Sequence, residues 1–240
     1  MIYQKATIRK DKRDIGSMFD LIAWRYDFLN HFLSFGIDRS WRRKAVEKIS
    51  GKYANPRIID VATGTGDLAI EAVKLCPSKI TGIDISEKML ELGRQKIKSG
   101  NLENVIEFVK CDSENICYED NTFDSAIVAF GVRNFQDPLK GLSEMRRVIR
   151  PGGMVVVLEF SKPEGFPLKH VYNFYFRNLL PFFGSLFSRH GKAYRYLNES
   201  VMEFADNEEF INFMIAAGLS ETSQTRMTGG IVSIYTGIKN

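Results

Sequence analysis

RIIDVATGTGDL, residues 57–68, is the stretch of sequence that decides the fold. Its first six residues form a continuous apolar and β-branched run around one acid, which is typical of a buried strand. Gly64 and Gly66 then allow a sharp turn, and a helix is predicted over 67–75. Strand, glycine turn and helix together make the first half of a βαβ unit. In open α/β sheets, ligands bind at such carboxyl ends of strands.

The same alternation continues along the chain. Ser86 is placed to cap a helix that stops at Gly100, and Pro151-Gly152-Gly153 is placed to end another. Strands alternating with helices imply right-handed crossovers and a parallel sheet covered on both faces. The sequence therefore predicts a doubly wound α/β fold, with further strands at 79–84, 105–112, 123–130 and 154–160 and helices at 86–100 and 138–150.

The two ends of the chain depart from this rhythm. After a predicted helix at 207–218, strands at 220–227 and 231–238 are separated only by a Gly229-Gly230 turn, so they must be antiparallel. The sheet should therefore have seven strands and end in an antiparallel hairpin. At the other end, apolar residues spaced three or four apart predict N-terminal helices within residues 1–50.

Composition limits the class of protein. The 240 residues are 44% hydrophobic and 26% charged, which is typical of a globular chain. There is no apolar run of roughly 18 residues to span a membrane and no apolar segment behind the basic N-terminus to act as a signal peptide. The three cysteines are odd in number and form no CxxC pair, which argues against a disulfide framework and a zinc site. A cytoplasmic location is expected.

The glycine loop fits two kinds of ligand. Gly64-x-Gly66-x-x-Ala69 satisfies the dinucleotide fingerprint, and Asp84, eighteen residues after Gly66, could bind a ribose. However, Asp60 and Asp67 flank the loop, and no Lys or Arg occurs between 58 and 73. Carboxylates repel a pyrophosphate but attract the ammonium and sulfonium of S-adenosyl-L-methionine. We therefore favour this methyl donor over NAD.

A second acidic site follows the third predicted strand. Asp112 could accept the exocyclic amine of adenine, and the backbone N–H of Ser113 could meet a ring nitrogen. An ordinary turn acid is the alternative.

Beyond these features, the chain closely resembles the UbiE/MenG family of quinone-biosynthesis C-methyltransferases over nearly its whole length. The resemblance rests on motifs of which FGVRN (130–134) and LEFSKP (158–163) are the most specific. The other matching strings are YD (26–27), SFGI (34–37), Trp41, the loop around 60–68, DNTFD (120–124), SL (185–186) and YRYL (194–197).

The resemblance implies a class I methyltransferase fold with a helical insertion after strand five, and product release as S-adenosyl-L-homocysteine. By resemblance, Thr65, Asp84, Asp112 and Ser113 are donor-binding positions. The full predicted donor site is Asp60, Gly64, Thr65, Gly66, Asp84, Ile85, Asp112, Ser113 and Ala129. This chain departs from the family in having Thr63-Gly64 where Gly-Gly is usual, Ala129 where Ser is frequent, and Ser113 where Ala is frequent.

The implied reaction methylates a ring carbon of a polyprenylated demethylmenaquinol. A hydroquinone has a pKa of roughly 10, so the site needs a proton acceptor or a stabilised phenolate. We predict that Arg133 stabilises the oxyanion and that Asn134 orients the ring hydroxyl, with a salt bridge within the loop as the alternative for Arg133. Tyr26, on the N-terminal segment, is a third catalytic candidate or a packing residue. A ubiquinone-type benzoquinol or another lipid-like phenol remains an alternative acceptor.

Two other functions agree less well with the sequence than a methyltransferase does. An NAD-linked oxidoreductase conflicts with the acidic loop, and a non-catalytic binding module conflicts with the intact run from Asp60 to Arg133. The string AFGVRN (129–134) also differs from the (D/N/S)PP(Y/F/W) motif of methyltransferases that act on nucleic acid. We expect no nucleic-acid partner. No metal is expected either, because no cluster has ligand spacing.

Residues 166–205 form an aromatic and basic insertion within the predicted methyltransferase domain, residues 51–240. Eight of the 22 residues from 166 to 187 are Phe or Tyr, and residues 162–195 hold six Lys or Arg against one acid. Such a segment could line a groove for a polyprenyl tail and attract anionic headgroups. We expect peripheral contact with the cytoplasmic face of the membrane. The same segment could instead pack as core or as a homodimer surface, and residues 1–50 are expected to form a lid.

Overall fold

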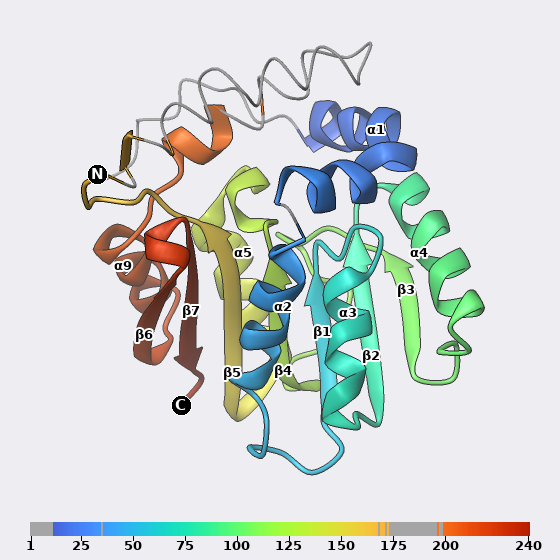
Figure 1. Ribbon diagram of the computed structural model, residues 1–240. Coiled ribbons are helices and arrows are strands. Elements are labelled where there is room, and N and C mark those ends of the chain that lie inside the picture. The colour runs from blue at the N-terminus through green and yellow to red at the C-terminus, as the bar shows by residue number, and fades with distance from the viewer. Residues whose placement is uncertain (1–11, 35, 168, 171, 173–195, 197–198) are drawn as a thin grey trace.

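The computed structural model describes residues 12–34, 36–167, 169–170, 172, 196 and 199–240. One seven-stranded sheet runs through the molecule in the order β3-β2-β1-β4-β5-β7-β6 (Figure 1). Its strands are β1 (Arg57–Val61), β2 (Lys79–Asp84), β3 (Ile106–Lys110), β4 (Phe123–Ala129), β5 (Ile149–Phe160), β6 (Ser220–Met227) and β7 (Val232–Ile238).

The strand pairing confirms the predicted fold class. The first five strands pair in parallel, whereas β7 is antiparallel to both of its neighbours, β5 and β6. The chain builds outward from β1 to β3 and then returns to place β4 on the other side of β1. This reversal between β1 and β4 is the topological switch point, where ligands of such sheets bind.

Helices cover both faces of the sheet (Figure 1). Neighbouring strand residues alternate between the two cores: Ile58 packs with α2, α3 and α4, whereas Ile59 packs with α5 and α9. The described helices are α1 (Lys12–Leu33), α2 (Asp38–Glu47), α3 (Asp67–Ala72), α4 (Glu87–Ser99), α5 (Pro138–Val148) and α9 (Glu208–Ala216). Short 3-10 turns lie at η1 (Val73–Leu75), η2 (Val132–Asn134) and η4 (Thr228–Gly230).

One boundary differs from the prediction. The helix expected over 138–150 ends at Val148, and β5 begins at Ile149, several residues before the predicted strand. Ile149 already pairs with Phe123 of β4, so its backbone belongs to the sheet. Gly152 has a φ of +77° and donates its N–H to the carbonyl of Lys239. Pro151-Gly152-Gly153 is therefore a bend within β5 and not the end of the helix.

The cysteines also differ from the prediction. Cys111 and Cys117 are paired as a disulfide, with Cα atoms 6.1 Å apart. Counting cysteines and looking for CxxC could not find this pair, because the turn between the two residues brings them together. Cys76 is a free, exposed cysteine. Within the described part of the chain, no helix is both long enough and apolar enough to cross a bilayer.

Phe108 of β3 fills a space that three glycines leave open. A Cβ atom placed on Gly82 of β2 would lie 2.5 Å from Cδ1 of the Phe108 ring, and one on Gly93 of α4 would lie 2.8 Å from Cε2. A Cβ on Gly66 would also meet this ring. Phe108 thus joins the glycine loop, β2 and α4 in one packed unit, which holds the loop against the sheet.

We predict that Gly82→Ala lowers the free energy of unfolding by about 1–3 kcal/mol, because the added methyl group overpacks this site. Urea unfolding followed by circular dichroism would measure it. Phe108→Leu should reduce the penalty of Gly82→Ala, since the smaller side chain leaves room for the methyl. Gly165→Ala is the matched control, because nothing lies within 4 Å of a Cβ there. Equal penalties with Phe or Leu at position 108 would contradict the packing argument.

Candidate active site at the carboxyl end of the sheet

A cleft of about 690 Å³ opens at the carboxyl ends of the parallel strands. A second pocket of about 360 Å³ adjoins it, and both are lined by Ala62, Gly64, Ala129 and Phe130. Of the predicted donor-binding residues, the larger cleft is lined by Gly64, Asp84, Ile85, Asp112, Ser113 and Ala129, and the smaller pocket by Asp60, Gly64, Thr65 and Ala129. The structure thus brings together every predicted donor residue except Gly66, which packs on Phe108.

The ends of β1 and β4 approach each other closely at this site. Ala62 and Phe130, the residues just after the two strands, have positive φ angles of 53° and 57°. Such angles are uncommon for residues other than glycine and cluster at functional sites. A Cβ atom on Gly131 would lie 2.8 Å from Cβ of Ala62, so this position needs glycine.

Two carboxylates, the buried Asp60 and the partly buried Asp84, shape the glycine loop. Asp60 Oδ2 accepts a hydrogen bond from the Thr63 hydroxyl at 2.5 Å. Asp84 uses one oxygen to accept from the backbone N–H of Gly64 and the other to accept from that of Ser86, each at 2.9 Å. A carboxylate has roughly four lone-pair positions, so Asp84 retains acceptor capacity for further hydroxyl groups.

Asp60 is the more unusual of the two. Its side chain is fully buried, and Oδ1 has no hydrogen-bond partner among the described residues. Burial raises its pKa from 3.8 to about 7, although the Thr63 hydroxyl, the backbone N–H of Ala69 and the Arg42 charge act in the opposite direction. Burial also raises the pKa of Asp84. A buried carboxylate that lines a pocket and has one oxygen without a partner suits a cationic ligand group.

Asp67 and Thr65 have cationic neighbours that the linear sequence did not reveal. Lys96 Nζ lies 2.7 Å from Asp67 Oδ1 and 2.9 Å from the Thr65 hydroxyl. Arg42 Nη2 and His31 Nε2 lie 3.6 and 3.5 Å from Asp67 Oδ2. The prediction that Asp67 adds negative charge for the donor is therefore weakened, and the charge argument rests on Asp60.

The loop after β3 places the predicted adenine residues in the larger cleft. Asp112 Oδ1 accepts the backbone N–H of Glu114, and Glu114 Oε1 accepts that of Gln136 at 2.7 Å. These bonds tie the loop to the segment that follows β4. Glu114 also lines the cleft, which the sequence did not predict.

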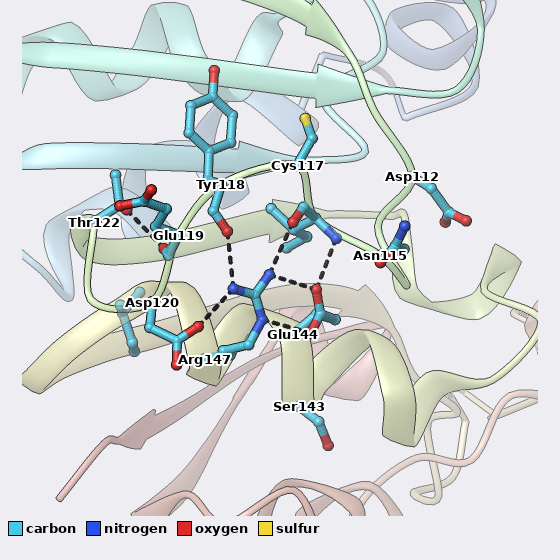
Figure 2. A network of polar contacts seen from close by, with 12 residues as sticks. Asp112, Asn115, Cys117, Tyr118, Glu119, Asp120, Thr122, Ser143, Glu144 and Arg147 are labelled. Carbon is cyan, nitrogen blue, oxygen red and sulfur yellow. Dashed lines mark hydrogen bonds and ion pairs between the residues drawn. The ribbon is translucent and has the colours of Figure 1, made fainter.

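Arg147 of α5 fixes the rest of this loop, as Figure 2 shows. Its guanidinium bonds to both carboxylate oxygens of Glu144 at 2.7 and 2.8 Å, to Asp120, and to the carbonyls of Ile116 and Tyr118. Glu144 in turn accepts the backbone N–H of Ile116 at 2.8 Å. The Arg147 bonds hold the pKa of Glu144 below its usual range. This network anchors residues 116–120 and thereby the end of the loop that carries Asp112.

The predicted catalytic pair lies after β4, in η2. Asn134 lines the larger cleft, and its side-chain oxygen accepts a hydrogen bond from the Tyr196 hydroxyl at 3.2 Å. Arg133 is only 4% exposed and does not line either pocket. Its Nη1 donates to Glu159 Oε1 at 2.7 Å and to the carbonyl of Phe130 at 2.5 Å. Arg133 does form a salt bridge, but its partner is Glu159 on β5 and not a residue within the loop.

The remaining predictions cannot be followed as far. Tyr26 lies on α1, but its side chain is outside the described part of the structure, as are most residues of the insertion over 166–205. Four residues of the site were not predicted from the sequence: Glu159, Tyr196, Arg42 and Lys96. Glu159 and Tyr196 are within the resembling strings LEFSKP and YRYL, which was the available signal for these two.

The fold and the site together define the class of protein, a Rossmann-like methyltransferase. Its cleft lies at the topological switch point of the sheet and is lined by the residues predicted to bind the donor. Two solved structures share the fold. A SAM-dependent methyltransferase from Thermotoga maritima, titled a possible histamine N-methyltransferase, is 21% identical with a TM-score of 0.66, covering 93% of this chain and 99% of that one. A SAM-dependent methyltransferase from Aquifex aeolicus is 20% identical with a TM-score of 0.60, covering 82% and 89%.

Sequence similarity narrows the class further. Residues 6–239 match the ubiE/COQ5 methyltransferase family, and the chain belongs to this family. The ubiquinone/menaquinone biosynthesis C-methyltransferase UbiE of Geotalea daltonii is 51% identical over 228 residues, 94% of this chain and 96% of that protein. The demethylmenaquinone methyltransferase of Bacteroides fragilis is 44% identical over 231 residues, 96% and 94% of the two chains. The family resemblance predicted from the motifs is thus confirmed.

The pKa of Asp60 predicts a pH dependence of stability. Because the folded protein keeps this proton up to about pH 7, whereas the unfolded chain loses it near 4, Asp60 contributes stability below pH 4 that is lost as the pH rises through 7. From pH 5 to pH 8, the free energy of unfolding of the wild-type protein should fall by roughly 3 kcal/mol relative to that of Asp60→Asn. Denaturant unfolding of both proteins across this range measures the difference, and parallel curves would contradict the assignment.

Proposed function

We propose that the protein transfers a methyl group from S-adenosyl-L-methionine to a ring carbon of a demethylmenaquinol, as one step of menaquinone biosynthesis. The donor is supported by one observation above all: Asp60, whose buried Oδ1 has no hydrogen-bond partner among the described residues, lines a pocket that shares four lining residues with the cleft of Asp84. The acceptor is supported by the 44% identical relative that is named a demethylmenaquinone methyltransferase.

The residues of the cleft fit each part of the donor. Asp84 can accept the two ribose hydroxyls with the lone pairs that Gly64 and Ser86 leave available. Asp112 and Ser113 border the side of the cleft assigned to adenine. Asp60 is placed to pair with the ammonium of the methionine moiety. When bound, the donor supplies an electrophilic methyl group on a sulfonium.

On the acceptor side, we assign Asn134 to the hydroxyl next to the methylated carbon. Its amide is positioned by Tyr196, and burial raises the pKa of that phenol to about 12, so Tyr196 acts as a neutral donor. Arg133 was predicted to stabilise the oxyanion directly. Because Nη1 is held by Glu159 and Phe130 and the side chain lines neither pocket, we assign Arg133 to positioning this turn, so that it acts on the acceptor through Asn134.

The wider setting of the reaction is also proposed. Residues 1–50 are assigned a lid role, supported by Ile15 and Phe19, which line the larger cleft, and by Asp20, which accepts the Ser86 hydroxyl at 2.5 Å. We propose a cytoplasmic protein in which residues 166–205 contact the membrane surface and receive the polyprenyl tail. Co-sedimentation with anionic phospholipid vesicles tests the contact, and sedimentation velocity without vesicles tests the alternative, a homodimer.

The acceptor is tested by methyl transfer from labelled donor, run anaerobically with a reductant. We predict that a short-tailed demethylmenaquinol is methylated at least roughly tenfold faster than the matching benzoquinol. Asn134→Ala should lower kcat by about 100-fold while the donor Kd stays unchanged, because the amide acts only on the acceptor.

Either of two results would change the assignment. Faster methylation of the benzoquinol would favour the ubiquinone-type alternative, which the name of the Geotalea daltonii relative supports. No product from either quinol, with the donor still bound, would leave a methyltransferase with another acceptor.

A further inference from the structure

Arg42 lines the smaller pocket although it does not come from the sheet or its loops. It lies on α2, its side chain is 9% exposed, and it faces the glycine loop across a pocket that also contains Asp60, Thr63 and Thr65. Its guanidinium lies over the Phe130 ring, 5.7 Å from the centroid. Arg42 is thus a buried cation at the side of the pocket next to the glycine loop.

The guanidinium has more donors than its partners use. Within the described residues, it makes one hydrogen bond, to Asp38 one turn earlier on α2. Its other anionic partner among these residues is Asp67, with Nη2 and Oδ2 3.6 Å apart. A guanidinium has five N–H donors in a planar fork that matches a carboxylate. Arg42 can therefore donate hydrogen bonds to the two oxygens of another carboxylate and keep its bond to Asp38.

The pocket offers opposite charges to the two ends of an amino acid. Asp60 has a buried carboxylate oxygen without a partner, and Arg42 has unused donors, with both residues bordering the same 360 Å³ space. We infer that Arg42 binds the α-carboxylate of the donor's methionine moiety while Asp60 binds its α-ammonium. This inference rests on the proposed donor and adds the residue that binds the carboxylate of the donor's amino acid end.

A metal ion is a poorer occupant of this region. His31, Asp38 and Asp67 lie close enough together to share one. However, Arg42 bonds to Asp38, and Lys96 Nζ lies 2.7 Å from Asp67. Two fixed cations already neutralise these carboxylates and would repel a metal ion. Asp38 and Asp67 instead hold Arg42 in place, through Nη1 and Nη2 respectively.

Arg42 would also link donor binding to the N-terminal segment. The glycine loop belongs to the β1–α3 unit, whereas Arg42 belongs to α2, which precedes the first strand. A carboxylate bound between them bridges two parts of the chain. Binding of a ligand with the amino acid end should therefore tie α2 to the loop, whereas a ligand without that end should not.

The test compares two ligands by isothermal titration calorimetry. S-adenosylhomocysteine carries the amino acid end, and 5′-deoxy-5′-methylthioadenosine keeps the adenosine and sulfur but lacks it. We expect Arg42→Met to weaken binding of S-adenosylhomocysteine by roughly 30-fold, as for loss of a charge-assisted hydrogen-bonded pair. The same variant should weaken the binding of methylthioadenosine by less than about threefold, because that ligand does not reach Arg42.

Arg43→Met is the matched control, since Arg43 is exposed and follows Arg42 on the same helix. It should change neither affinity. Arg42→Lys keeps the positive charge but loses the planar pair of N–H donors. Its affinity for S-adenosylhomocysteine should lie between those of wild type and Arg42→Met, and its affinity for methylthioadenosine should not change. Because the two ligands are compared within each variant, a general loss of folded protein affects both equally.

The outcomes separate this inference from the proposed function. Equal weakening of both ligands by Arg42→Met, or no weakening of either, would overturn the role of Arg42 while the donor assignment stands. Failure of the wild-type protein to bind S-adenosylhomocysteine at all would overturn the donor and this inference together.

Discussion

The glycine loop depends on two carboxylates at neighbouring strand ends, one buried and one partly buried. Asp60, at the end of β1, accepts the Thr63 hydroxyl, and Asp84, at the end of β2, accepts the backbone N–H of Gly64. These two bonds hold the loop against the ends of β1 and β2. Burying two carboxylates 
costs free energy, and in Asp60 that cost shows as a pKa raised to about 7. A ligand that brings a cation to Asp60 would recover part of it.

The fold was largely predictable because it follows from local patterns. Continuous apolar strands such as 57–62 indicate a sheet buried on both faces, and the structure places Ile58 and Ile59 in opposite cores. The short Gly229-Gly230 turn required an antiparallel hairpin, which is present as β6 and β7. The error at Pro151 has the same origin, because a Pro-Gly-Gly string ends a helix and bends a strand equally well.

The candidate site was predictable in its position but not in its partners. Strand ends gather at one edge of a parallel sheet, so Asp60, Asp84 and Asp112 could be grouped from the sequence. Lys96 and Arg42 meet Asp67 from α4 and α2, about 25 to 30 positions away in the chain. Arg133 meets Glu159 across two strands in the same way. Side-chain partners at such separations depend on packing, which residue spacing does not encode.

The central claim is that Asp60 receives the cationic end of the methyl donor. It is tested most directly by titrating the protein with S-adenosylhomocysteine at pH 7 in buffers of different ionisation enthalpy, which counts the protons exchanged on binding. If the bound ammonium favours ionised Asp60, the wild-type protein should release about half a proton per ligand, and Asp60→Asn should release none. The same proton count for both proteins would contradict the claim.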